Sequence, residues 1–209
     1  SRRAKVLRPL RSSFERYGEV FVSLGVSFVP NFVSLYDEGV GDEGLYSELT
    51  PPKSSGERWI GVAPFAKHKG KIYPLDRMEK VVSKLSEESR VKIFLFGSGD
   101  REREILSLWR ERYPGVISLA DKRYGFAVEL SLMSRLDVMI LMDSANMHLA
   151  SLMEVPVVSV WGATHPYCGF LGWRQSDSGV VELPLDCRPC SVFGNKPCYR
   201  KDYACLEIA

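Results

Sequence analysis

The sequence predicts an α/β protein with a Rossmann-like, doubly wound parallel sheet. From residue 59 onward, five short apolar segments alternate with segments of helical periodicity. The apolar segments are hydrophobic throughout rather than at every second position, as expected for strands that helices cover on both faces. Each connection is long enough for a right-handed crossover, so neighbouring strands are expected to be parallel.

The expected strands and helices follow one another in order. The strands are expected at Trp59–Ala63, Val91–Phe96, Val116–Leu119, Asp137–Met142 and Val157–Val160. The helices between them are expected at Leu75–Leu85, Arg101–Arg112, Ala127–Ser134 and Ser144–Met153.

The first 56 residues have a different pattern. Apolar residues recur there at helical spacing, before a glycine that suits a helix end: Phe14, Tyr17, Val20, Phe21, Leu24 and then Gly25. Residues 26–56 lack periodicity and contain loop-forming stretches of glycine, proline and acidic residues. We therefore expect a boundary near residue 56, with residues 57–209 forming the Rossmann-like domain.

Composition and charge narrow the class of protein. With 209 residues and 45% hydrophobic content, the chain has ample apolar material for a core. Its net charge of +2 gives no reason to expect nucleic-acid binding, and no run of about 18 apolar residues is present to span a membrane. A cytoplasmic protein is therefore expected. The basic start, Ser1 to Arg8, gives the alternative of peripheral contact with anionic lipid at the inner face of the cytoplasmic membrane.

Ligands of doubly wound sheets bind beyond the carboxyl ends of the strands. The loop after the first expected strand carries three lysines and a histidine in five residues: Lys67, His68, Lys69 and Lys71. Such a loop could neutralise a diphosphate, and a solvated charged loop is the alternative. The loop after the second strand contains Gly97 and Gly99, which permit a tight turn. Asp100 could cap the next helix or accept hydrogen bonds from ribose hydroxyls, but the spacing does not match Gly-x-Gly-x-x-Gly.

The segment Asp143 to Ala150 follows a buried strand and opens a helix. Unpaired N–H groups of Ser144 and Ala145 at the helix start would favour phosphate. Asp143 could hold a hydroxylated ligand or serve as an N-cap. His148 lies inside the helix, where a packed histidine is more common than a catalyst, and His165 follows the last expected strand on the same side of the sheet.

The end of the chain is rich in cysteine. Four thiols fall within 19 residues, at Cys187, Cys190, Cys198 and Cys205. The first pair has the spacing of zinc ligands, whereas the second does not match common zinc ribbons, so a structural zinc site, reduced structural thiols and disulfides all remain open. Cys168 stands apart and is expected to pack in the interior.

Four motifs in this order resemble glycosyltransferase family 9, the ADP-heptose:lipopolysaccharide heptosyltransferase family. They are Lys71-Ile72-Tyr73-Pro74, the Phe-Gly-Ser-Gly-Asp of residues 96–100, the segment 143–150 and Val160-Trp161-Gly162-Ala163-Thr164. The resemblance spans about residues 57–208 and includes the cysteine-rich tail. It implies the C-terminal half of a GT-B glycosyltransferase, in which two Rossmann-like domains face each other and the C-terminal one holds the nucleotide-sugar donor. Residues 1–56 would then be a remnant of the N-terminal domain with the interdomain helix and linker.

The resemblance also implies roles for single residues. Lys71 matches a lysine that contacts the donor phosphate, and Asp143 opens an Asp-[Ser/Thr]-Gly-x-x-His motif that lies against the donor sugar and diphosphate and ends at His148. Ser144 and Ala145 would donate main-chain N–H groups to phosphate. The family usually has glycine at the position of Ala145, and a methyl group there is expected to hinder close backbone approach or a positive φ.

The same resemblance implies binding roles for three further residues and the reaction itself. Gly97 lies in the motif that resembles the family's donor-binding loop. The family's ribose-binding carboxylate maps loosely to Asp100 or Glu102. The implied reaction transfers a sugar with inversion from a donor such as ADP-heptose to a lipopolysaccharide core acceptor, with Lys71 and Asp143 as catalytic residues. No cofactor is required, because a lysine and a helix terminus replace a cation. The acceptor domain, with the general base, would be missing from this chain, so a non-catalytic nucleotide-sugar-binding or interaction module is the alternative.

Overall fold

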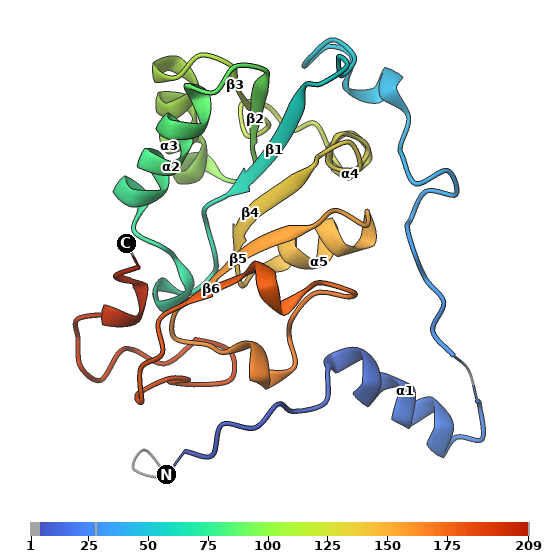
Figure 1. The fold of residues 1–209 in the computed structure, drawn as a ribbon, viewed down its shortest axis with the longest axis vertical. Helices are drawn as coiled ribbons and strands as arrows, with labels where there is room; N and C mark the ends of the chain where they lie inside the picture. Colours follow the sequence, from blue (N-terminus) through green and yellow to red (C-terminus); the bar gives the residue numbers. More distant parts are fainter. Residues whose placement is uncertain (1–4, 28, 209) are drawn as a thin grey trace.

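The computed structural model describes residues 5–27 and 29–208 and has a doubly wound α/β architecture (Figure 1). Its sheet consists of six parallel strands in the order β3-β2-β1-β4-β5-β6. The strands are β1 (Arg58–Ala63), β2 (Val91–Leu95), β3 (Val116–Ser118), β4 (Val138–Met142), β5 (Val157–Trp161) and β6 (Val180–Glu182). All five expected strands are present within a residue of their expected bounds. The sixth, β6, was not expected, because it is a three-residue, half-buried edge strand without an apolar run.

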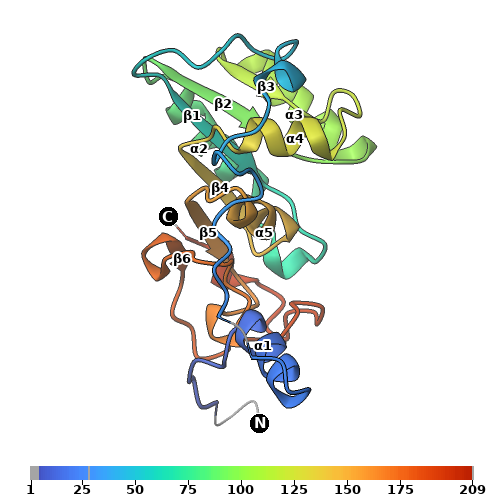
Figure 2. The same ribbon diagram turned by 90° about the vertical axis from the view of Figure 1, so that its right-hand side faces the viewer.

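The helices cover both faces of the sheet. They are α1 (Ser13–Ser23), α2 (Leu75–Ser86), α3 (Asp100–Arg112), α4 (Phe126–Met133) and α5 (Ala145–Leu152). Short 3₁₀ turns are η1 (Glu43–Tyr46), η2 (Lys69–Lys71), η3 (Pro166–Cys168), η4 (Asp177–Gly179) and η5 (Ala204–Leu206). The core on one face includes residues of α2 and α3, and the core on the other includes residues of α4 and α5 (Figures 1 and 2). The predicted fold class is therefore confirmed.

The strand order creates a switch point between β1 and β4. From β1 the chain moves outward to β2 and β3, and then returns to place β4 on the other side of β1. The loops that follow β1 and β4 therefore leave the same edge of the sheet in opposite directions. This divergence opens a crevice at the carboxyl ends of the strands, where ligands of such sheets bind.

The N-terminal segment lies along the outside of this domain. Ser12 and Glu15 form a capping box at the start of α1, and Gly25, with φ of +79°, follows its end as expected. Figure 1 shows a linker that runs from α1 along one side of the molecule to η1. There Tyr46 is fully buried, with its ring centroid 6.0 Å from that of Trp59. Residues before the expected boundary at 56 thus pack on the sheet, and the boundary stays a prediction.

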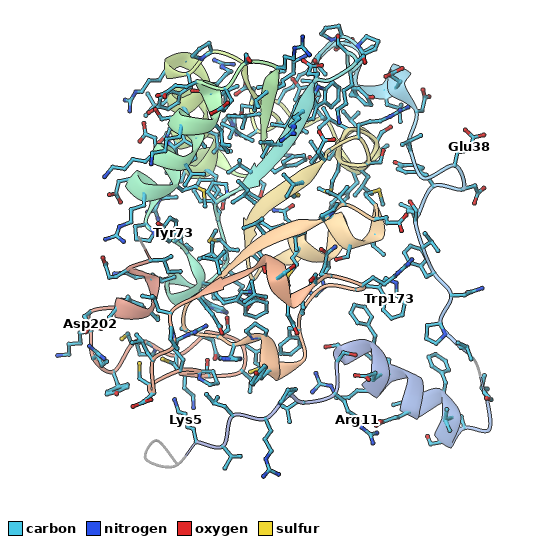
Figure 3. The ribbon with its side chains drawn as sticks, in the orientation of Figure 1. Lys5, Arg11, Glu38, Tyr73, Trp173 and Asp202 are labelled. Atoms are coloured by element: carbon cyan, nitrogen blue, oxygen red, sulfur yellow. The ribbon has the colours of Figure 1, made fainter. Side chains whose placement is uncertain are left out.

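The tail after β6 folds back over the carboxyl edge of the sheet. Its end is tied to the start of α2, because Tyr73 Oη and Arg77 Nη1 donate to the Ile208 carbonyl at 2.9 and 2.7 Å. Trp173, labelled in Figure 3, packs on α1 with its ring centroid 5.1 Å from that of Phe14.

Two expectations concern the membrane. None of the helices in the described part of the chain is long and apolar enough to cross a bilayer. Half of the basic start proposed as a lipid surface, residues 1–4, lies outside the described residues.

Candidate functional site

A cleft of about 1060 Å³ lies at the switch point, over the carboxyl ends of the central strands. Its walls come from the loops after β1, β2, β3 and β4, and from the tail. The residues assigned to donor binding all line this one cleft: Lys71, Gly97, Asp100, Glu102, Asp143, Ser144, Ala145 and His148. Lys67 and His68 of the basic loop line it too, whereas Lys69 does not and has its Nζ 5.1 Å from the ring centroid of Tyr203. The sequence therefore located the cleft, while the role of each residue stays a prediction.

Three side chains, those of Lys71, Asp143 and Thr164, meet at the edge of the sheet, and the first two line the cleft. Lys71 Nζ lies 2.8 Å from Asp143 Oδ2, and Thr164 Oγ1 donates to the same oxygen at 2.7 Å. The side chains of Lys71 and Asp143 are only 15% and 8% exposed. A carboxylate this buried needs such partners, because water no longer stabilises its charge. Both contacts fall on Oδ2, and no described residue forms a hydrogen bond with Oδ1.

The position of Lys71 follows from the packing of its turn. Lys71 belongs to η2, and the buried Gly70 beside it accepts a hydrogen bond from Ala163 N at 2.7 Å. A Cβ on Gly70 would lie 2.7 Å from the Cβ of Ala163, so only glycine allows this approach. The lysine turn is thereby fixed against the loop that follows β5.

The N-terminus of α5 forms the wall next to Lys71. Ser144 is the N-cap in an extended conformation, and its Oγ is buried without a hydrogen-bond partner among the described residues. Asp143 is therefore not the N-cap, the alternative that the sequence left open; it pairs with Lys71 instead. Ala145 is the first helical residue, it is exposed, and it is absent from the non-glycine residues with positive φ. Ala145 therefore needs no positive φ here, and hindrance of close backbone approach by its methyl group stays a prediction.

His148 lies about one turn further along α5 and also lines the cleft. Burial lowers the pKa of His148; Lys71 lowers it further, and Asp143 opposes the shift. The shift favours the neutral imidazole. This form can donate or accept a hydrogen bond without adding positive charge to the cleft.

The loop after β2 forms the opposite wall. A Cβ on Gly97 would lie 2.8 Å from Leu106 Cδ1, which explains the glycine, and Ser98 N donates to Glu102 Oε2 at 2.8 Å. Asp100 does not cap α3, because the N-cap is Gly99, with φ of +82°. Its exposed carboxylate instead accepts a hydrogen bond from Arg103 at 2.5 Å.

Other residues depart from expectation. His165 is buried outside the cleft lining, with Nε2 3.5 Å from Glu182 Oε1 and Nδ1 accepting from Tyr167 N. Thr164 ends one of the four motifs, but no role in the site was predicted for it, although a hydroxyl residue in the loop after a predicted strand was a usable signal. Arg188, a buried arginine within the cysteine-rich tail, was also missed.

The cysteines are all free thiols. Among residues 5–27 and 29–208, no group of three or more His, Cys, Asp or Glu side chains is arranged to hold a metal ion. Burial raises the pKa of Cys190, and raises that of Cys205 to about 11, which favours the neutral thiol. The zinc site predicted from the spacing therefore receives no support from the arrangement. Cys168 is buried, as expected.

A doubly wound parallel sheet with a ligand cleft at its switch point defines a Rossmann-like α/β protein. The family model of glycosyltransferase family 9 (heptosyltransferase) matches residues 42–198. The chain belongs to this family, so the resemblance seen in the motifs is confirmed.

Relatives agree with this assignment. Lipooligosaccharide heptosyltransferase 2 from two strains of Campylobacter jejuni is 26% and 24% identical over 156 residues. Each alignment covers 73% of this chain but only 47% and 48% of the relative, so the chain spans about half the length of the curated relatives it matches.

Solved structures show the same fold. The Escherichia coli heptosyltransferase WaaC with ADP has a TM-score of 0.65 at 17% identity, over 87% of this chain and 53% of that one. A family 9 glycosyltransferase from Veillonella parvula also has a TM-score of 0.65, at 19% identity, over 85% and 51%.

Proposed function

We propose that the cleft binds the diphosphate of a nucleotide-sugar donor of the ADP-heptose type, and that this chain is the donor-binding part of an inverting glycosyltransferase. One observation carries the proposal. A nearly buried ammonium group, Lys71 Nζ, is held beside the open N-terminus of α5, where Ser144 Oγ is buried without a partner among the described residues. A fixed cation and unpaired donors beside each other are suited to an anionic oxygen.

The strand order supports one orientation of the donor. With the diphosphate between Lys71 and Ser144, the nucleoside would lie toward β2 and β3, and the sugar toward β5 and the tail. Glu102 stands on the nucleoside side with Oε1 available for ribose hydroxyls, since Oε2 accepts from Ser98 N. On the sugar side, Phe170 and Phe193 line the cleft, with ring centroids 5.7 Å apart.

This arrangement would assist departure of the nucleoside diphosphate. As the bond to the anomeric carbon breaks, negative charge grows on the diphosphate, and Lys71 with the amides of Ser144 and Ala145 would stabilise it. Asp143 keeps the ammonium in place, and its Oδ1 can accept a hydrogen bond from a donor hydroxyl. A lysine and a helix terminus supply the positive potential, so this role calls for no metal ion.

The acceptor would be a sugar of a lipopolysaccharide core. We assign acceptor binding, and the base that deprotonates its hydroxyl, to the part of the longer relatives that this chain does not match. Because such an acceptor carries lipid, the complete enzyme would act in the cytoplasm at the inner face of the membrane.

A second candidate is a nucleotide-sugar-binding module without catalysis. It is favoured by the extent of the match, because the residues that match cover only 47% and 48% of the relatives and leave out the part to which we assign the base. Both candidates require the same donor site.

Calorimetric titration with adenosine, AMP, ADP, GDP and UDP tests the donor site. We expect ADP to bind at least about tenfold more tightly than AMP, because the second phosphate reaches Lys71 and α5. Weaker binding of GDP and UDP would establish adenine as the base. Equal affinity for AMP and ADP would contradict a diphosphate site. Both candidates predict no turnover by this chain alone, so turnover of an ADP-sugar with a core acceptor is measured after the chain has been joined to the part of a relative that it does not match; turnover then favours the enzyme, and its absence favours the binding module.

A further inference from the structure

Arg188 is an unusual residue for an irregular tail. Its side chain is almost fully buried, yet it carries a positive charge at any physiological pH. Burying a guanidinium is unfavourable unless its N–H groups are paired. Here the donors reach five acceptors: Gly162 O at 2.5 Å, Leu183 O at 2.7 Å, Glu182 Oε2 at 2.8 Å, Thr164 O at 2.9 Å and Trp161 O at 3.0 Å.

Three of those acceptors belong to one short segment, residues 161–164, which begins at the last residue of β5. The remaining carbonyl of the segment, Ala163 O, accepts from Cys190 N at 2.7 Å, so the tail binds all four carbonyls. On its other side the segment holds the site. Ala163 N donates to Gly70 in the lysine turn, and Thr164 Oγ1 donates to Asp143.

The tail also touches Lys71 directly. A Cβ on Gly194, which has φ of +70°, would lie 2.8 Å from Cγ and Cδ of Lys71 and 3.1 Å from Cγ2 of Thr164. The backbone of the tail therefore covers the aliphatic stem of the lysine and leaves its ammonium directed at Asp143. The tail is anchored at a further point by Lys5, which donates to the Pro189 carbonyl at 2.8 Å (Figure 3).

We propose that Arg188 is a positioning residue for donor binding. It fixes the segment 161–164, and through Thr164 and Gly70 it holds Asp143 and Lys71 in the geometry that a diphosphate requires. The inference rests on the proposed function of the cleft. Arg188 does not touch the donor in this account, and its effect passes through Lys71. The cysteine-rich tail is then part of the donor site rather than an appendage.

A double-mutant cycle tests this coupling. The affinity for ADP is measured by calorimetry on the wild type, Lys71→Ala, Arg188→Met and the double variant, after circular dichroism has shown that each is folded. We expect Arg188→Met to weaken ADP binding about tenfold, and to weaken AMP binding much less. In the Lys71→Ala background Arg188→Met should change ADP affinity less than about twofold, because no ammonium remains to be positioned.

The possible results separate a positioning role from a general structural one. Additive losses in the double variant, or unchanged ADP affinity in Arg188→Met, would overturn the proposal. Arg77→Met is the matched control, since it also removes a tail contact, at Ile208, but lies outside the cleft lining, and it should leave ADP affinity unchanged. If Arg188→Met does not fold, the same cycle is run with Arg188→Lys, which keeps the charge but loses donors. A wild type that does not bind ADP would refute the proposed function itself, before the cycle is begun.

Discussion

Lys71 and Asp143 form a buried ion pair, which we interpret as serving ligand binding rather than stability. Taking both charges out of water costs about as much as their attraction returns, so a buried ion pair is weak evidence for a stabilising role. The pair does hold an ammonium group at a fixed point in the cleft. We therefore interpret the pair as preorganisation for an anion.

Replacing Lys71 tests this interpretation at the scale of one residue. Lys71→Ala should weaken ADP binding about 10- to 100-fold, because charge-assisted hydrogen bonds to phosphate are among the strong ones. Calorimetry gives the dissociation constant. Lys80→Ala, an exposed lysine on α2, is the control and should bind ADP as the wild type does. An unchanged affinity in Lys71→Ala would remove this lysine from the site.

His148 gives a pH prediction. Burial sets the pKa of His148 below its ordinary value of about 6.5, so the unfolded chain takes up a proton at a higher pH than the folded one. Stability is then full above about pH 6.5 and decreases as pH falls from there toward the folded pKa. Urea unfolding at several pH values should show this decrease, and His148→Gln should reduce it. A decrease of equal size in the variant would assign it to other groups.

Some of these residues could be predicted from the sequence and others could not. Lys71, Asp143 and Ser144 follow predicted strands, and the carboxyl ends of parallel strands meet at one edge, so their proximity could be inferred. Arg188 could not be found in this way, because the path of an irregular tail leaves no periodic signal. Its partners are backbone carbonyls, which no residue pattern records.

At the scale of elements, the sheet and its helices were predictable because their burial is regular. Central strands buried on both faces are apolar throughout, and glycine marks the end of α1. The edge strand β6 is half-buried, so its three residues carry no such signal. The tail is the element that the sequence described least well, since cysteine spacing suggested a metal site where the structure has free thiols.

The burial of the tail's thiols predicts how fast each of them reacts. Burial raises the pKa of Cys205 to about 11, so only about one thiol in a thousand is ionised at pH 8. In the folded protein Cys205 should be alkylated by iodoacetamide much more slowly than the half-buried Cys198. Mass spectrometry of the labelled peptides measures both rates, with urea-unfolded protein as the control in which the rates become similar. Equally fast labelling of both cysteines in the folded protein would show that the tail is not packed as described.

At the scale of the whole molecule, the fold explains why distant residues share one site. Lys71, Asp143 and Thr164 follow β1, β4 and β5, which are adjacent in the sheet although the residues span nearly half of the chain. The tail closes the arrangement by returning to the same edge. We therefore propose that the sheet and the tail together, without any other part of the longer relatives, are enough to bind the donor.

The most direct test of that claim is the location of bound ADP on the isolated chain. Amide signals in two-dimensional ¹⁵N–¹H NMR spectra are followed during titration with ADP. Our account predicts that the amides of Ser144, Ala145 and Asn146 shift most, together with that of Lys71, while Val157 at the opposite edge of the sheet does not respond. Shifts confined to the smaller cavity beside Trp173 and Gln175, or no shifts with saturating ADP, would contradict it.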